Sequence, residues 1–202
     1  METLADLQTP IFWAEGHPGK LERDSWELQI IGACLEPQTI SWAQLMLLPA
    51  TTVDGRLTSV TRWSVRGNWE GVTLKTLLEL VKTKPSVKYV RFWSVGLVYD
   101  TSIPLDIALK EKSLVAWKFN EEFLTEDYGG PIRAFIPYLW GYKSAESIFK
   151  IELLDHYIPG FWEKRGYTDS AEIEAGPCRD MNDDGEFKQI PGGEVLRFLE
   201  DK

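Results

Sequence analysis

The sequence predicts an α+β fold in which strands dominate and short helices lie between them. Several short runs rich in β-branched and aromatic residues end at Gly or Pro, which is typical of strands. The helical patterns are short and do not alternate regularly with these runs, so a doubly wound parallel sheet is not expected. A chain of 202 residues, 44% hydrophobic and 26% charged, is expected to form one domain or one domain with an extension.

The predicted strands follow the chain from one end to the other. Residues 26–32 alternate apolar and polar side chains, as a half-buried strand does. The runs at 132–136 and 148–154 are rich in Ile and Phe and predict buried strands. Further strands are expected at residues 53–60, 87–93, 97–103 and 114–119.

Short helices are expected where a capping residue precedes an apolar stripe. Ser41 opens a capping-box pattern and begins a helix over residues 42–48. Thr73 caps a second helix over residues 74–81, whose leucines share one face. A further helical turn is expected at residues 104–109, where a Pro stands at the start.

The segment Gly141, Tyr142, Lys143 and Ser144 lies between two predicted strands and has two interpretations. A Gly allows close backbone approach to a ligand, a Lys supplies positive charge, and a Ser supplies a hydroxyl and an N–H group. The segment is therefore a candidate anion cradle, although it lacks the spacing of a P-loop. Taken alone, it is more typical of an ordinary hairpin loop between the two strands.

Composition argues against several kinds of partner and location. The formal net charge of −9 makes nucleic acid or an anionic membrane an unexpected partner, because both are negatively charged. No apolar run is long enough for a transmembrane helix, and residues 1–10 lack a signal-peptide pattern, so a cytoplasmic location is expected. The cysteines, Cys34 and Cys178, imply no disulfide framework.

Residues 177–202 are polar, acidic and rich in Gly, and we predict that they extend a domain formed by residues 1–176. Asp180 to Glu186 matches the first half of an EF-hand calcium loop. Pro191 stands where the loop requires its last Glu ligand, and no helical pattern precedes Asp180. A solvent-exposed acidic turn is therefore preferred over a calcium site.

Several segments together resemble one known family. They read SVTRWSVRGNWEGVTLKTLL from Ser59, GGPIRAFIP from Gly129, GYKSAESIFKIELLD from Gly141 and PGFWEKRGY from Pro159. This wording resembles the molybdopterin-binding domain of sulfite oxidase-type oxidoreductases, and especially its small single-domain bacterial members. The resemblance implies a compact α+β fold, a molybdopterin cofactor and oxygen-atom transfer at a molybdenum centre.

The resemblance also marks one departure, at Ser59. In the small bacterial members, a cysteine that ligates molybdenum opens the motif Cys-Val-Thr-Arg-Trp-Ser, and here Ser59 opens the same motif. Ser59 is therefore the expected metal-facing residue. A soft thiolate binds a transition metal better than a neutral hydroxyl, which must lose a proton to ligate. Metal loading and catalysis are accordingly expected to be weak.

The same resemblance implies the remaining site residues. Arg62 is expected to act beside Ser59 in catalysis and in cofactor binding. The other implied cofactor-binding residues are Trp63, Arg133, Tyr142, Lys143 and Ser144, with Arg66 nearby and Trp140 as a further aromatic wall. The N-terminal segment with His17 resembles the segment that crosses the cofactor pocket in the family, although a loop His is usually just solvated.

Three functions are compatible with these observations. The preferred one is a molybdopterin-dependent oxidoreductase domain that acts on a small oxyanion or sulfoxide with an unidentified electron partner. The second is a non-catalytic descendant that binds pterin or another anion, or serves as an interaction domain. The third is an aromatic-rich acidic binding module, for instance for carbohydrate, which requires a row of exposed Trp side chains.

Overall fold

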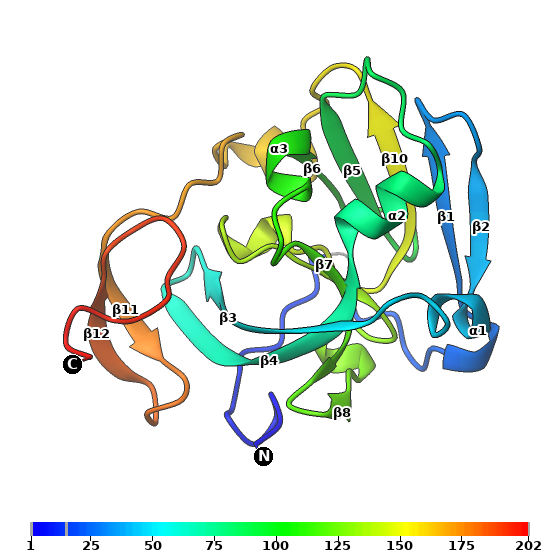
Figure 1. The fold of residues 1–202 in the computed structure, drawn as a ribbon. Helices are drawn as coiled ribbons and strands as arrows, with labels where there is room; N and C mark the ends of the chain where they lie inside the picture. Colours follow the sequence, from blue (N-terminus) through cyan, green and yellow to red (C-terminus); the bar gives the residue numbers. More distant parts are fainter. Residues whose placement is uncertain (1, 15, 202) are drawn as a thin grey trace.

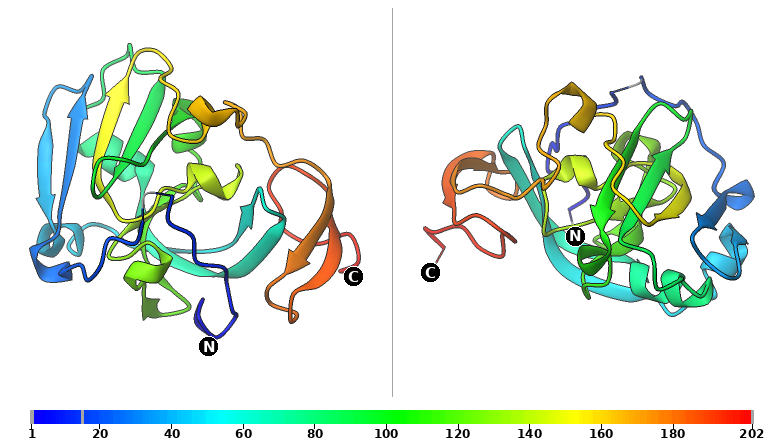
Figure 2. Two further views of the ribbon diagram at one scale, coloured as in Figure 1. Left: turned by 180° about the vertical axis from the view of Figure 1, so that it is seen from behind. Right: turned by 90° about the horizontal axis from the view of Figure 1, so that it is seen from above.

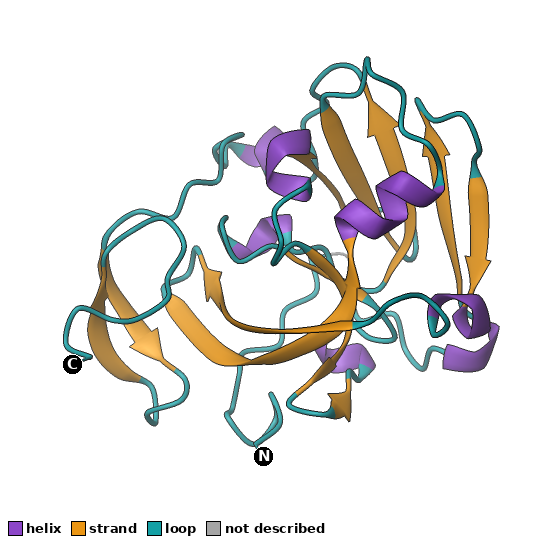
Figure 3. Cartoon of the chain, in the orientation of Figure 1, coloured by secondary structure: helices purple, strands orange, loops and turns teal. Residues whose placement is uncertain are grey.

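Two β-sheets carry the fold in residues 2–14 and 16–201, which are the residues that this computed structural model describes. Figure 1 shows the two sheets, and Figure 3 shows that strands dominate while the helices are short. The predicted α+β class is confirmed. Within the described residues no helix has the length and hydropathy needed to cross a membrane.

The first sheet has the strand order β2-β1-β10-β5-β6. Its parallel pair is β1 with β10, and the other neighbours are antiparallel. The strands are β1 (Glu27–Gly32), β2 (Gln38–Ser41), β5 (Tyr89–Ser94), β6 (Asp100–Pro104) and β10 (Ile148–Leu154).

The second sheet has the order β12-β11-β4-β7-β8, with β3 added on β4 and β9 added on β7. Its longest strand, β4, crosses the lower half of Figure 1 and pairs with β3, β7 and β11. The strands are β3 (Thr51–Ser59), β4 (Trp63–Thr73), β7 (Leu114–Phe119), β8 (Glu122–Phe123), β9 (Arg133–Phe135), β11 (Gly176–Asp180) and β12 (Glu186–Ile190).

Short helices close the gaps between strands. Ser41 caps α1 (Trp42–Leu45) in the predicted capping box, and Thr73 caps α2 (Leu74–Leu80). The remaining helical turns are α3 (Leu105–Ala108) and the 3-10 turns η1 (Arg23–Ser25), η2 (Glu126–Tyr128), η3 (Gly141–Lys143) and η4 (Glu163–Arg165). The capping signals were local, and for that reason the sequence predicted where both capped helices begin.

The predicted strands at 132–136 and 148–154 do not form a hairpin. The first becomes β9, which pairs with β7, and the second becomes β10, which pairs with β1 and β5. The hairpin interpretation of residues 141–144 is therefore wrong. The chain between the two strands crosses from one sheet to the other and forms η3 on the way.

Two clusters of buried apolar side chains form the hydrophobic core between the strands and helices. The larger includes Leu28, Phe92 and Ile151 and joins the first sheet to α2. In the smaller cluster, Trp69 stacks on Phe135 with ring centroids 4.5 Å apart. Burial of such large rings supplies much of the free energy that stabilises a small domain.

Residues 177–201 pack onto the second sheet. The β11–β12 hairpin lies at one edge of the molecule in Figures 1 and 2, and β11 runs parallel to the start of β4. Ile190, Val195 and Phe198 are buried in the larger cluster. The predicted boundary after residue 176 falls at the start of β11, so this segment shares a sheet with the rest of the chain.

The acidic turn between β11 and β12 is held by basic side chains. Asp180 accepts hydrogen bonds from Arg56 and Lys188, each at 3.0 Å, and Lys188 also contacts Asp183 at 2.8 Å. These carboxylates raise the pKa of Lys188. In the described part of the chain, no group of three or more His, Cys, Asp or Glu side chains is placed to hold a metal ion.

Candidate functional site

A cavity of about 450 Å³ lies where the β3–β4 turn, η3 and the N-terminal segment meet. The left view of Figure 2 shows this N-terminal segment running across the molecule toward β1. The wall combines aromatic rings with a few polar groups, as ligand pockets usually do. Its lining includes Thr9, Phe12, Trp13, Leu57, Ser59, Thr61, Trp63, Tyr99, Tyr128, Arg133, Tyr142, Ser144, Glu146, Trp162 and Tyr167.

Ser59 stands at the end of β3 and lines the cavity. A three-residue turn follows it, in which the N–H of Arg62 donates to the Ser59 carbonyl at 2.9 Å. Arg62 has a φ of +63°, as expected for the last loop residue in a hairpin of this length. The tight turn therefore fixes the direction of the Ser59 side chain.

The Ser59 hydroxyl is hydrogen bonded to Thr61. The two hydroxyl oxygens are 2.8 Å apart, and the Thr61 N–H donates to Ser59 Oγ at 3.2 Å. Thr61 can thus supply two donors to one oxygen. Both donors would be available to Ser59 Oγ when this oxygen acts as an acceptor.

Arg62 does not line the cavity, which corrects its expected position. Its guanidinium donates to the Glu174 carbonyl at 3.0 Å and lies 5.0 Å from the ring of Trp140. The left-handed backbone at Arg62 turns the side chain toward the segment that leads into β11. Trp140 is itself buried and is outside the cavity wall.

Lys143 is also placed behind the cavity, not in its wall. Its side chain is 0% exposed, and Nζ forms an ion pair with Glu163 and donates to the Ser102 carbonyl at 2.9 Å. Burial lowers the pKa of Lys143, and the Glu163 carboxylate opposes this shift. The lysine proposed as an anion contact therefore neutralises a buried carboxylate.

Trp63, Arg133, Tyr142 and Ser144 line the same cavity as Ser59. The Ser144 hydroxyl accepts from the N–H of Ile136 at 3.0 Å, and the Tyr142 hydroxyl donates to the Thr168 carbonyl at 2.7 Å. Burial raises the pKa of Tyr142 to about 12, so this phenol is neutral at physiological pH.

Arg133 is the basic residue of the cavity wall. Its NH1 group contacts Glu146 at 3.0 Å and donates to the Tyr128 carbonyl at 2.9 Å, and NH2 donates to the Ser144 carbonyl at 3.1 Å. The side chain is only 4% exposed. Arg66, by contrast, pairs with Asp54 outside this cavity.

Three polar atoms of the wall residues are buried without a hydrogen-bond partner in the described structure: Thr9 Oγ1, Trp13 Nε1 and Arg133 Nε. A buried polar group that lacks a partner costs free energy, so a polar ligand at this place would recover it. Thr9 and Trp13 were not predicted, because the N-terminal segment has no recognisable pattern. His17 lies outside the wall and contacts Asp127 at 3.0 Å.

The thiols are remote from this site. Cys34 and Cys178 are buried and neither lines the cavity. Burial raises the pKa of Cys178 to about 11, which disfavours the thiolate form that a metal requires. Ser59, by contrast, is a hydroxyl-bearing residue of the cavity wall.

The cavity suits the pterin part of a molybdopterin. It offers unpaired donors in Trp13 and Arg133, and aromatic walls that match a fused polar ring system. The fold and this cavity together define a cofactor-binding domain of the sulfite oxidase type. Residues 14–162 match the family described as the oxidoreductase molybdopterin binding domain, and the chain belongs to this family.

Relatives in sequence carry oxidoreductase names. The chain is 31% identical over 159 residues to the uncharacterized oxidoreductase YuiH of Bacillus subtilis, covering 78% of this chain and 80% of that protein. It is 30% identical over 156 residues to the protein-methionine-sulfoxide reductase catalytic subunit MsrP of Gluconobacter oxydans, covering 69% of this chain and 50% of that protein. The chain thus spans about half the length of MsrP.

A solved structure supports the fold. The sulfane dehydrogenase SoxCD from Paracoccus pantotrophus matches with a TM-score of 0.67 over 86% of this chain and 46% of that chain. The sequence identity is 18%, so this likeness concerns the architecture. Molybdopterin is the cofactor that the family implies.

Proposed function

We propose that this domain performs oxygen-atom transfer at a molybdenum centre bound in the 450 Å³ cavity, with Ser59 facing the metal. The observation that carries the proposal is the β3–β4 turn, which directs Ser59 into the same cavity as Trp63 and Arg133. The bound cofactor would supply a metal that accepts and donates an oxygen atom and electrons. The chain's own residues would bind and orient the cofactor.

The hydroxyl of Ser59 makes metal loading the weak step. Its proton must be lost before the oxygen can replace a thiolate, and the two hydrogen bonds from Thr61 only partly lower this cost. We therefore expect little metal per chain and slow turnover, while pterin binding continues. Arg133 Nε and Trp13 Nε1 would donate to the pterin because they have no protein acceptor in the described structure.

The rim of the cavity suits a small, partly apolar substrate. Phe12 lies 5.9 Å from Trp162, and Trp162 lies 4.9 Å from Tyr167, measured between ring centroids. These rings would exclude water and contact the carbon groups of a sulfoxide. The names of the MsrP relatives also support a sulfoxide substrate. Its reduction consumes two electrons and two protons, and a separate redox partner would supply the electrons. A cytoplasmic location stays a prediction.

The variant Ser59→Cys tests this proposal. Made in a host that synthesises the cofactor, it should carry at least tenfold more molybdenum per chain than the protein with Ser59, because the thiolate is the better ligand. Sulfoxide reduction with an artificial electron donor should rise in parallel. Ser64→Cys is the matched control, since Ser64 lies on the same hairpin but bonds to Thr58 outside the cavity wall.

Two results would contradict the proposal. Full molybdenum content and equal activity in the protein with Ser59 would show that serine serves as the ligand without loss. Absence of pterin from both forms would instead favour the alternative function, a non-catalytic anion-binding or interaction domain. The placement of the cations favours that alternative. Arg62 and Lys143 lie outside the cavity wall, and Glu146 forms an ion pair with Arg133 within it.

A further inference from the structure

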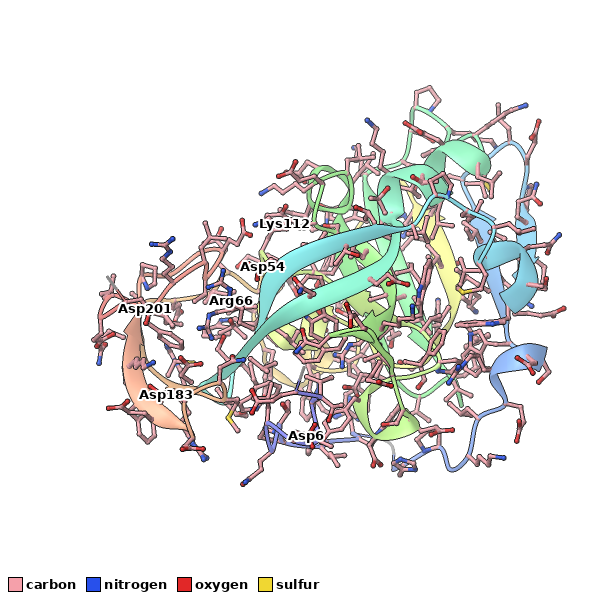
Figure 4. All side chains as sticks on the ribbon, turned by 60° about the horizontal axis from the view of Figure 1, so that its bottom comes forward. Asp6, Asp54, Arg66, Lys112, Asp183 and Asp201 are labelled. Carbon is pink, nitrogen blue, oxygen red and sulfur yellow. The ribbon has the colours of Figure 1, made fainter. Side chains whose placement is uncertain are left out.

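A second cavity, of about 230 Å³, lies between the β3–β4 pair and the C-terminal segment. Figure 4 labels Asp54, Arg66 and Lys112 beside the β3–β4 pair, with Asp201 on the C-terminal segment. The wall is formed by Asp54, Gly55, Arg56, Arg66, Lys112, Val195, Leu196 and Arg197. None of these residues lines the cofactor cavity.

The wall is basic although the chain as a whole is acidic. It contains four cationic side chains and one carboxylate, in a protein whose formal net charge is −9. Three of the cations have acidic partners: Arg66 with Asp54, Lys112 with Glu194, and Arg56 with Asp180. Arg197 is exposed and has no ion-pair partner in the described part of the chain.

Arg56 gives a second, independent indication of a ligand site. Its side chain is 5% exposed, and Nε has no hydrogen-bond partner in the described residues. The group is held firmly, because NH1 donates to Asp180 at 3.0 Å and the guanidinium lies 4.4 Å from the ring of Phe198. A buried charged N–H donor without an acceptor is costly, and an anion oxygen is its natural partner.

We propose that this second cavity binds a small oxyanion of the phosphate or sulfate class. Arg56, Arg66 and Lys112 would come from the β3–β4 pair and the turn after α3, and Arg197 from the C-terminal segment. Such an anion would bridge the segment to the sheet. The site does not depend on the cofactor, because strand alternation directs Arg56 and Ser59 to opposite faces of the hairpin.

Calorimetric titration with inorganic phosphate tests the proposal. The protein should carry its cofactor, so that the first cavity is filled, and ionic strength should be held constant. We expect one saturable site, and a rise in Tm of roughly 5–10 °C at a phosphate concentration about one hundred times Kd. Arg197→Ala should weaken phosphate binding about tenfold or more, because it removes a charged donor.

Lys75→Ala is the control, since Lys75 is an exposed cation on α2 that pairs with Glu79 and does not line this cavity. Phosphate affinity should be unchanged in this variant. Arg66→Gln provides a second test, because it leaves the Asp54 carboxylate without its partner in the cavity wall and should abolish binding. No saturable phosphate binding, or equal weakening by Arg197→Ala and Lys75→Ala, would overturn the proposal.

Discussion

The two faces of the β3–β4 hairpin differ in chemistry although they alternate along the same strands. On one face, Leu57, Ser59 and Trp63 look into the cofactor cavity. On the other face, Arg56 and its cross-strand partner Arg66 look into the basic cavity under the C-terminal segment. Because neighbouring side chains of a strand point to opposite faces, one hairpin supports both environments.

The two faces of the hairpin are stabilised by different interactions. The cofactor face depends on close packing of rings and a glycine, as at Trp69, Phe119 and Gly67. The charged face depends on buried ion pairs, of which Arg56 with Asp180 is the most deeply buried. Substitutions on the cofactor face should therefore act on stability through packing, and substitutions on the charged face should act through electrostatic interactions.

The largest loss of stability is expected for Arg56→Met. This change leaves Asp180 buried, with Lys188 as its remaining ion-pair partner, and breaking a buried pair costs about 3–5 kcal/mol. We expect a loss of about 3 kcal/mol in the free energy of unfolding in urea. Arg179→Met, at an exposed position of β11, should change it by less than about 0.5 kcal/mol. Equal losses of unfolding free energy in the two variants would show that the buried Arg56–Asp180 pair does not stabilise this face.

The packing of the cofactor face is tested by Gly67→Ala. A Cβ atom at Gly67 would lie 2.2 Å from the ring of Phe119, which must then move. Overpacking of this kind costs about 1–3 kcal/mol, so the Tm should fall by several degrees. At Gly55 the nearest atom, in the ring of Phe135, is 3.0 Å away, and Gly55→Ala should cost less. An unchanged Tm for Gly67→Ala would show that the ring moves freely.

A charge on the cofactor face is tested by Glu146→Gln. Glu146 lines the cavity and neutralises Arg133, which would otherwise attract the cofactor's phosphate. Removing the negative charge should slow pterin loss after dilution about fivefold, which corresponds to about 1 kcal/mol. Pterin fluorescence per chain measures this. Glu79→Gln, at an exposed position of α2, should leave the rate unchanged. A faster loss of pterin from Glu146→Gln would show that Glu146 supports the cofactor.

The sequence predicted features that depend on neighbours along the chain. The capping box at Ser41 is formed, with hydrogen bonds of 2.9 and 3.3 Å to Gln44. Strand pairing is non-local, and the assignment of residues 132–136 and 148–154 to one hairpin failed for that reason. The strand β4 was not predicted because Gly67 and Gly71 interrupt its apolar alternation.

The candidate site was predicted only in part, for a similar reason. Ser59 at the end of β3 and Arg133 in β9 both line the cavity, and their roles toward a cofactor stay predictions. Lys143 does not line the cavity, because its ammonium group forms a buried ion pair with Glu163. A local motif cannot show which distant carboxylate will compete with a ligand for a cation.

The smallest effect is expected at the exposed edge of the charged face, for Asp54→Asn. Arg66 donates to Asp54 at 2.9 and 2.6 Å, and this pairing lowers the pKa of Asp54 below its ordinary value of 3.8. Both side chains are more than 40% exposed, at 44% and 52%, so solvent screening limits the contribution to about 0.2–1 kcal/mol.

The sign of its pH dependence follows from the direction of that shift. A depressed folded-state pKa means that the unfolded chain binds the proton more readily, so the pair stabilises the protein above pH 4 or so. The stabilisation is lost as the pH falls through the lowered pKa. The difference in unfolding free energy between the parent and Asp54→Asn should therefore be larger at pH 6 than in acid, and should shrink as the pH falls through the lowered pKa of Asp54. It should also shrink in high salt, whereas the loss caused by Arg56→Met should persist, because salt screens exposed pairs more than buried ones. If the loss of unfolding free energy in Asp54→Asn did not depend on salt, Asp54 would behave like a buried charge. The edge and the centre of this face would then not differ in screening by solvent.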